Sequence, residues 1–174
     1  SCIPSDPLHM GAVPGMVVTE NMILGEQATY QKYGGLSLNW PQARQHADTL
    51  LNETFVSSPP GLDVYVETLS GGNLQRVLIA RELGRNPKLL FAYYPARGLD
   101  ISNATAARRL LLQYRDAGTG ILLVSEDLEE LFTLSDRLIV MYHGEIVGSC
   151  KPEETSTYEV GRLMTGAKKE MAYA

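Results

Sequence analysis

Short apolar runs alternate with segments of helical periodicity from Leu69 onward, and this alternation constrains the fold more than any other feature of the sequence. Apolar runs of about five residues have the length of a buried strand, and the longer segments between them repeat apolar residues at helical spacing. Strands separated by helices in this way form a mainly parallel sheet. The sequence therefore predicts an α/β fold, with strands at 89–93, 121–124 and 138–142 and helices at 74–83, 102–115 and 127–134.

The residues before this alternation predict a smaller, helical region. Asn39 can cap a helix that has Pro41 in its first turn, and we expect that helix at 40–54. A shorter helix is expected at 18–27, and the Pro- and Gly-containing stretch at 56–68 is expected to be a loop. We divide the chain into a helical subdomain at 1–86, a core part at 87–150 that ends in a hairpin around His143-Gly144, and a tail at 151–174.

Composition excludes several classes of protein. The 174 residues are 44% hydrophobic and 20% charged, as in one globular domain or a large piece of one. The formal net charge of −5 offers no basic surface to a nucleic acid, and no apolar run approaches the length of a membrane-spanning helix. Cys2 and Cys150 lie far apart in the sequence, which indicates neither a disulfide framework nor a zinc site and suits a reducing compartment.

Ser70, Gly71 and Gly72 lie where a loop is expected to become a helix. The first N–H groups of a helix have no intrahelical acceptor, the helix dipole is positive there, and glycine allows an anion to approach the backbone. The three residues can therefore bind an anion such as a phosphate. On the simpler interpretation, Ser70 only caps the helix and the glycines only form the turn.

The sequence around these residues, LSGGNLQ from Leu69 to Gln75, resembles the signature motif of the ATP-binding cassette (ABC) ATPases. Further segments follow in that family's order. They resemble the end of its signature helix (81–83), the entry into its Walker B strand (86–90), its D-loop (95–100), its switch region (123–130) and its closing strands (135–137 and 142–146). The resemblance is strongest to the second ATPase half of simple-sugar and nucleoside importers. It extends over nearly the whole chain and implies part of a P-loop NTPase core with an α-helical subdomain.

The family's phosphate-binding loop, GxxxxGK[ST], is missing from the sequence. A partial match at 161–169 has an extra residue before the lysine and lies in the tail, so we treat it as coincidental. Because the family's loop precedes the segment with which this chain begins, we expect the chain to be a C-terminal fragment.

The resemblance places other residue types at the family's catalytic positions. The Walker B aspartate falls on Tyr93, the catalytic glutamate on Tyr94, the switch histidine on Glu126 and the Q-loop glutamine on Ser5. A phenol is neutral at pH 7 and offers Mg²⁺ no charge. We therefore expect no catalytic residue and no metal in this chain's own site, with both tyrosines filling a buried strand. The acidic residues at 126–130 are expected to form a solvated helix start instead of a metal site.

The signature residues have a different expected role, because in this family the signature of one half faces the nucleotide of the other. The resemblance implies that Ser70, Gly71, Gly72 and Gln75 contact ATP bound to the partner half. It also implies that the D-loop residues cross the same interface, namely Gly98, Leu99 and Asp100. Residues 15–51 would meet the coupling helix of a permease, although core packing explains much of their apolar character.

The predicted function is that of an ATP-binding component, in fragment form, of an ABC importer for sugars or nucleosides. ATP and Mg²⁺ are implied for the full-length assembly, whereas this chain alone is expected to bind neither and to be inactive. The expected partners are the other nucleotide-binding half and the permease, at the cytoplasmic face of the membrane, with self-association through exposed sheet edges. Two alternatives remain: a non-enzymatic interaction or regulatory module derived from such a cassette, and an ABC protein that acts away from membranes.

Overall fold

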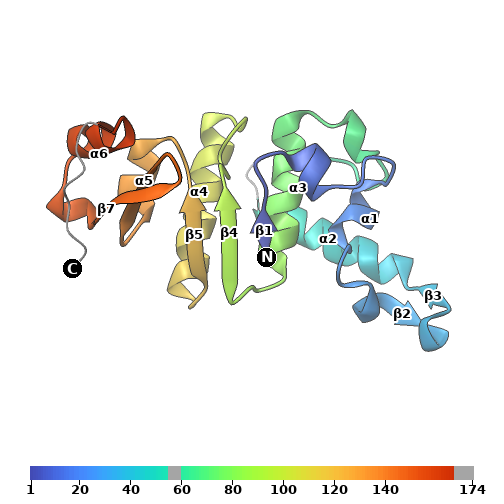
Figure 1. Cartoon of the computed structure of the whole chain (residues 1–174). Coiled ribbons are helices and arrows are strands. Elements are labelled where there is room, and N and C mark those ends of the chain that lie inside the picture. Colours follow the sequence, from blue (N-terminus) through green and yellow to red (C-terminus); the bar gives the residue numbers. More distant parts are fainter. Residues whose placement is uncertain (55–59, 167–174) are drawn as a thin grey trace. The chain divides into compact units, whose positions relative to one another are not determined.

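The computed structural model describes residues 1–54 and 60–166, and the chain divides into two compact units, Ser1–Val124 and Ser125–Ala174. The first unit contains β1 (Cys2–Ile3), α1 (Val18–Met22), β2 (Gln31–Lys32), β3 (Ser37–Leu38), α2 (Trp40–Thr54), α3 (Gly71–Gly84), β4 (Leu89–Tyr93), α4 (Ile101–Asp116) and β5 (Gly120–Val124) (Figure 1). The second contains α5 (Leu128–Leu134), β6 (Leu138–Tyr142), β7 (Glu145–Cys150) and α6 (Thr157–Met164).

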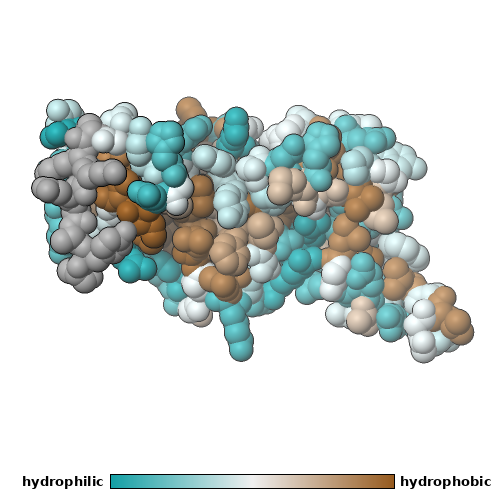
Figure 2. Space-filling model, in the orientation of Figure 1, coloured by the Kyte–Doolittle hydropathy of each residue, from teal (hydrophilic) through white to brown (hydrophobic). Residues whose placement is uncertain are grey.

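A parallel three-stranded sheet in the order β1-β4-β5 lies in the first unit. Its inner face is formed by Ile3, Leu90 and Ala92, each 0% exposed, and α3 contacts β1 while α4 contacts β5. On the other face Phe91 is 38% exposed and its register partner Leu122 is 46% exposed. Figure 2 shows the resulting apolar surface over β4 and β5.

The helices of the first unit form a second packed region around α3. Every residue of α3 from Leu74 to Leu83 is buried, and α1 and α2 both contact this helix. Beside them, Ile23, Tyr30 and Ala43 form a small apolar cluster. The Tyr30 hydroxyl is hydrogen-bonded to Nδ1 of His46, which gives this buried phenol a polar partner.

The second unit is built on the antiparallel β6–β7 hairpin. His143 and Gly144 form its two-residue turn with φ of 48° and 82°, which is the left-handed backbone that such tight hairpins require. Beneath the hairpin, Val140 of β6 is buried in one cluster with Val160 and Leu163 of α6.

The sequence predicted most of these elements, including α2, β4 and β6 with their exact bounds. The helix expected at 18–27 begins at Val18, but its expected end is wrong, because α1 ends at Met22 and Gly25 has a φ of 86° before a separate 3₁₀ turn at Gln27–Tyr30. Of the loop expected at 56–68, residues 56–59 lie outside the described residues, and Val66–Thr68 is a 3₁₀ turn.

The predicted subdomain boundaries at 86 and 150 stay a prediction, since a division into packed units does not test them. Residues 167–174 of the predicted tail lie outside the described part of the chain. Among the helices of the described residues, none has the length and apolar character needed to span a membrane.

Candidate functional site

The N-terminus of α3 presents the predicted anion-binding residues on the surface. Ser70 is the N-cap, and its Oγ accepts a hydrogen bond from the backbone N–H of Asn73 at 3.3 Å. Ser70 and Gly71 are exposed, and a Cβ atom on Gly71 would meet no atom within 4 Å. Since the N–H groups of Gly71 and Gly72 occupy the first two helical positions, they have no intrahelical acceptor. This end of α3 is therefore open to an anionic group.

The start of α3 lies directly against the turn that follows β4. A Cβ atom on Gly72 would come within 2.8 Å of the carbonyl oxygen of Gly98. One helical turn further on, Nε2 of Gln75 donates a hydrogen bond to the carbonyl oxygen of Pro95 at 3.0 Å. Two predicted groups of residues, those of the signature and those of the D-loop, are therefore in contact within one unit.

Gln75 differs from the other predicted signature residues because it is only 2% exposed. Its Nε2 donates to the carbonyl oxygen of Pro95, and its Oε1 is buried with no hydrogen-bond partner among the described residues. The structure thus directs this side chain toward the turn after β4 and away from the exposed helix N-terminus. Sequence reasoning missed this contact because its acceptor is a backbone carbonyl, which carries no residue-type signal.

The turn after β4 has an unusual backbone. Tyr94 has a φ of 49°, and its N–H donates to the carbonyl of Val124 at 2.8 Å, which ties the turn to β5. The N–H of Arg97 donates to the Tyr94 carbonyl at 3.0 Å, and Gly98 has a φ of 75°. Left-handed backbone at a residue other than glycine is uncommon and clusters at functional sites.

Asp100 ends this turn and caps α4. Its carboxylate accepts hydrogen bonds from the backbone N–H of Asn103 at 2.9 Å and from Nδ2 of Asn103 at 2.6 Å. These two bonds, the backbone bond first, lower the pKa of the Asp100 carboxyl below its ordinary value. The exposed Asp100 thus gives the predicted D-loop a carboxylate that is ionised at neutral pH and held in one orientation.

The expectation that Tyr93 and Tyr94 fill a buried strand is wrong for both, because Tyr93 is 39% exposed and Tyr94 is half-buried in the turn after β4. Alternate residues of β4 face opposite sides of the sheet, and Tyr93 faces the side with the exposed apolar residues. Ser5 follows β1 at the same edge of the sheet, since Ile3 is paired with Ala92. This edge offers two phenols and a hydroxyl in place of carboxylates, a set that does not fit Mg²⁺.

Glu126 lies in the second unit, just before α5. It is exposed, and the following Asp127 caps α5 by accepting from the backbone N–H of Glu130 at 3.2 Å. The predicted solvated helix start is wrong for Glu130, which is only 3% exposed because it is on the inner side of α5. In residues 1–54 and 60–166, no three His, Cys, Asp or Glu side chains gather closely enough to hold a metal ion.

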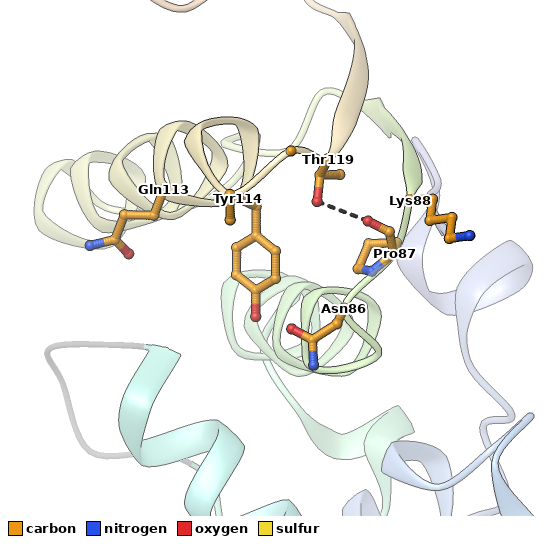
Figure 3. A pocket seen from close by; sticks show the side chains of 8 residues that line it. Asn86, Pro87, Lys88, Gln113, Tyr114 and Thr119 are labelled. Carbon is orange, nitrogen blue, oxygen red and sulfur yellow. Dashed lines mark hydrogen bonds between the residues drawn. The ribbon is translucent and has the colours of Figure 1, made fainter.

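A separate hollow of about 280 Å³ lies at the other end of the strands, where β4 and β5 begin. In Figure 3 the Tyr114 ring points from α4 toward the end of α3, and Lys88 points away from it. Thr119 closes one side by donating its hydroxyl to the carbonyl of Pro87 at 2.8 Å. Burial, followed by the nearby charge of Glu53, raises the pKa of Tyr114. This hollow does not include Ser70, Gly71 or Gly72 at the start of α3.

Comparison with curated proteins finds relatives along the whole chain. The chain is 35% identical over 175 residues to the glucose import ATP-binding protein TsgD13 of Haloferax volcanii, covering 100% of the chain and 32% of that protein. It is 39% identical over 172 residues to the guanosine import ATP-binding protein NupO of Bacillus subtilis, covering 98% of the chain and 33% of that protein. The chain thus spans about a third of the length of these relatives. No family model matches it.

Solved structures that resemble this fold include ATP-binding cassettes. The dimeric cassette MJ0796 in a post-hydrolysis state with ADP and phosphate matches 87% of the chain and 62% of its own length, with a TM-score of 0.73 and 23% identity. An ATP-binding subunit of an ABC transporter matches 94% of the chain and 67% of its own length, with a TM-score of 0.74 and 19% identity. The expected cassette fold is thereby confirmed.

Proposed function

Because the chain belongs to the ATP-binding proteins of ABC importers, we propose that it is part of the ATP-binding component of an importer for sugars or nucleosides. The homology to glucose and guanosine import proteins supports this solute class. The assembly would comprise a second nucleotide-binding half and a membrane permease, and the chain would lie at the cytoplasmic face of the membrane. ATP and Mg²⁺ would act in that assembly.

The observation that carries the proposal is the exposed, glycine-lined N-terminus of α3. ATP held by the other half would place its γ-phosphate here, where the Ser70 hydroxyl and the N–H groups of Gly71 and Gly72 can donate to it. Gln75 would act indirectly, by fixing the turn after β4 against α3 through its bond to Pro95. Gly98, Leu99 and Asp100 in that turn would then cross the interface to the partner half.

The chain's own catalytic positions support a role limited to the partner's site. Tyr93, Tyr94 and Ser5 carry no carboxylate, the group that would bind the metal and accept a proton from the attacking water. Exposed Glu126 would repel a γ-phosphate placed beside it. We therefore propose that this half's own site is degenerate and that hydrolysis occurs where its signature faces ATP on the other half.

Gly71→Asp in the full-length protein tests the phosphate contact. A Cβ at Gly71 meets no atom within 4 Å, and an acidic residue in the first turn suits the helix dipole, so the variant should fold normally. The new carboxylate would repel the phosphate, and ATP hydrolysis by the assembled importer should fall about tenfold or more. Gly71→Asn, with a neutral side chain of the same size, is the matched control and should lose much less.

Wild-type hydrolysis by Gly71→Asp would refute the phosphate contact. Isothermal titration of the 174-residue chain with Mg-ATP tests the degenerate site separately, and we expect no binding. Micromolar binding would instead require a nucleotide site within this chain. The exposed phenol of Tyr93 also suits a non-enzymatic module derived from a cassette, and a full-length protein that neither hydrolyses ATP nor supports uptake would favour that alternative.

A further inference from the structure

A buried ionic network lies in the C-terminal half of α3. The carboxylate of Glu82, whose side chain is 4% exposed, accepts a hydrogen bond from Nε of Arg81 at 2.8 Å and from Nη1 of Arg85 at 3.1 Å. The backbone N–H of Cys2 also donates to it at 3.2 Å. Two guanidinium groups on successive helical turns therefore share one buried carboxylate.

Both guanidinium groups also bind backbone carbonyls outside α3. Arg81 donates through Nη2 to the carbonyl of Gly11 at 2.8 Å and through Nη1 to that of Asn21 at 3.3 Å. Arg85 donates through Nη2 to the carbonyl of Leu24. These acceptors belong to a π-helical turn at Pro7–Gly11 and to α1 with the residues after it. The network thus attaches three points of the N-terminal region to a single helix.

Asn21 continues the network toward the surface. Its side chain is completely buried, with Oδ1 accepting from the N–H of Val13 at 2.8 Å. Its Nδ2 donates to the carbonyls of Val13 at 3.2 Å, Met16 at 3.2 Å and Val17 at 3.3 Å. One buried side chain therefore determines the shape of the loop at 13–17, in which the Val13 side chain is 40% exposed.

This network holds segments of the chain in fixed positions relative to α3 more than it stabilises the fold. Buried ion pairs add little net free energy of folding, because desolvation offsets their attraction. A guanidinium group, however, donates in a fixed planar arrangement and holds its acceptors in defined positions. Gly11 also packs directly against α3, because a Cβ on Gly11 would clash with Cδ1 of Leu78 in that helix. Displacing α3 alone would break these contacts together, so the attached segments must move with it.

We propose that Glu82 is a positioning residue that couples the two ends of this unit. With Arg81, Arg85 and Asn21, it would pass a displacement of α3 to the loop at 13–17. The inference rests on the proposed function, in which the first turn of α3 binds phosphate, and on the expectation that residues 15–51, which include part of this loop, meet the permease. Glu82 lies near the opposite end of α3 from the phosphate-binding turn and itself touches no reacting atom, so the network acts on coupling and not on the chemical step.

The test uses the full-length protein assembled with its permease in lipid vesicles. ATP hydrolysis and uptake of radiolabelled glucose and guanosine, the solutes named for two relatives, are measured on the same sample. Glu82→Gln keeps the side-chain shape but replaces an acceptor oxygen with a donor that faces the guanidinium groups. We expect uptake per ATP hydrolysed to fall about fivefold, with hydrolysis within about twofold of wild type.

Two further variants make the result decisive. The triple variant R81M/E82L/R85M removes all three charges together, which avoids leaving an unpaired buried charge, and should uncouple in the same way. Asp116→Asn is the matched control, because it breaks an exposed ion pair with Arg115 in the same unit, outside residues 15–51, and should keep the wild-type ratio.

Each remaining outcome has a defined meaning. An unchanged ratio in Glu82→Gln and in the triple variant overturns the inference. An equal loss of uptake and hydrolysis, or failure of both variants to fold, shows a structural role only and also overturns it. Failure of the proposed function looks different, because the wild-type protein itself would then show no ATP-driven uptake of either solute.

Discussion

Two adjacent glycines at the start of α3 have opposite surroundings. Gly71 faces open space, whereas Gly72 lies against the carbonyl oxygen of Gly98. The first leaves open space at the helix N-terminus, where we propose that phosphate binds, and the second allows the turn after β4 to approach the helix. The same residue type therefore serves two purposes at neighbouring positions.

Gly72→Ala should destabilise the unit that contains α3. Its Cβ would lie 2.8 Å from a backbone oxygen that no side-chain rotation can relieve. We expect a loss of about 1–3 kcal/mol in the free energy of unfolding. Urea unfolding followed by fluorescence measures this change, because the chain has a single tryptophan, Trp40, and that residue lies in the same unit.

Gly71→Ala is the control for that measurement. It makes the same chemical change one residue earlier, with no atom within 4 Å of the new Cβ. Its stability should equal that of wild type or exceed it by about 0.5 kcal/mol, since alanine restricts the unfolded chain. Equal effects of the two substitutions would show that α3 and the Gly98 turn are not in contact in solution.

At this scale the sequence predicted local helix capping better than it predicted burial or contacts between distant segments. Ser70 and Gly71 could be placed at a helix start because capping depends on local residue types. The burial of Gln75 could not be predicted, since its acceptor is the carbonyl of Pro95 and depends on how two distant segments meet. The buried acid Glu82 was missed for the same reason, because its partners include backbone groups far along the chain.

Among the elements, those with strong periodicity and clear end signals were predicted best. The helix α2 has Pro41 in its first turn, and β4 is a short apolar run between polar residues. The end of α1 was missed, because Leu24 continues the helical pattern while Gly25 stops it through a left-handed backbone. The β6–β7 hairpin was predicted from Gly144, although a histidine precedes that glycine.

His143→Asn should stabilise the hairpin. His143 has a φ of 48°, and asparagine tolerates the left-handed region better than histidine, most of all before glycine in a two-residue turn. We expect a gain of about 0.5–1 kcal/mol. Hydrogen exchange of the backbone amides in β6 and β7, followed by mass spectrometry, measures the gain as slower exchange.

Gly144→Ala provides the opposite change in the same turn. No atom lies within 4 Å of the new Cβ, so only backbone strain at a φ of 82° can act. Exchange should accelerate by an amount that corresponds to about 1–2 kcal/mol. If His143→Asn accelerated exchange, or Gly144→Ala slowed it, the turn would have a different conformation in solution.

On the scale of the whole molecule, the α/β class was predictable from the alternation of strands and helices. The exposure of one sheet face was not. Leu89, Phe91 and Tyr93 alternate with Leu90 and Ala92, so β4 reads as apolar on both faces, which is typical of a strand covered on both sides. Among the described residues, β1 and β5 are the edges of this sheet, and its outer face retains large exposed apolar side chains.

This face leads to a final prediction, that the 174-residue chain self-associates. Phe91 and Leu122 are 38% and 46% exposed on paired positions of neighbouring strands, and contiguous apolar surface of this kind promotes association. The double variant Phe91→Thr with Leu122→Thr keeps residues that suit strands but removes the apolar surface. Light scattering at increasing concentration should therefore show a lower average mass for the variant than for wild type.

Leu36→Ser is the matched control for that experiment. Leu36 is 89% exposed, so its replacement removes apolar surface at a site away from the three-stranded sheet. If this control lowers the average mass as much as the double variant does, association follows total exposed apolar surface and not the sheet face. A wild-type chain that stays monomeric at high concentration would show that the face does not drive association, and the prediction would be wrong.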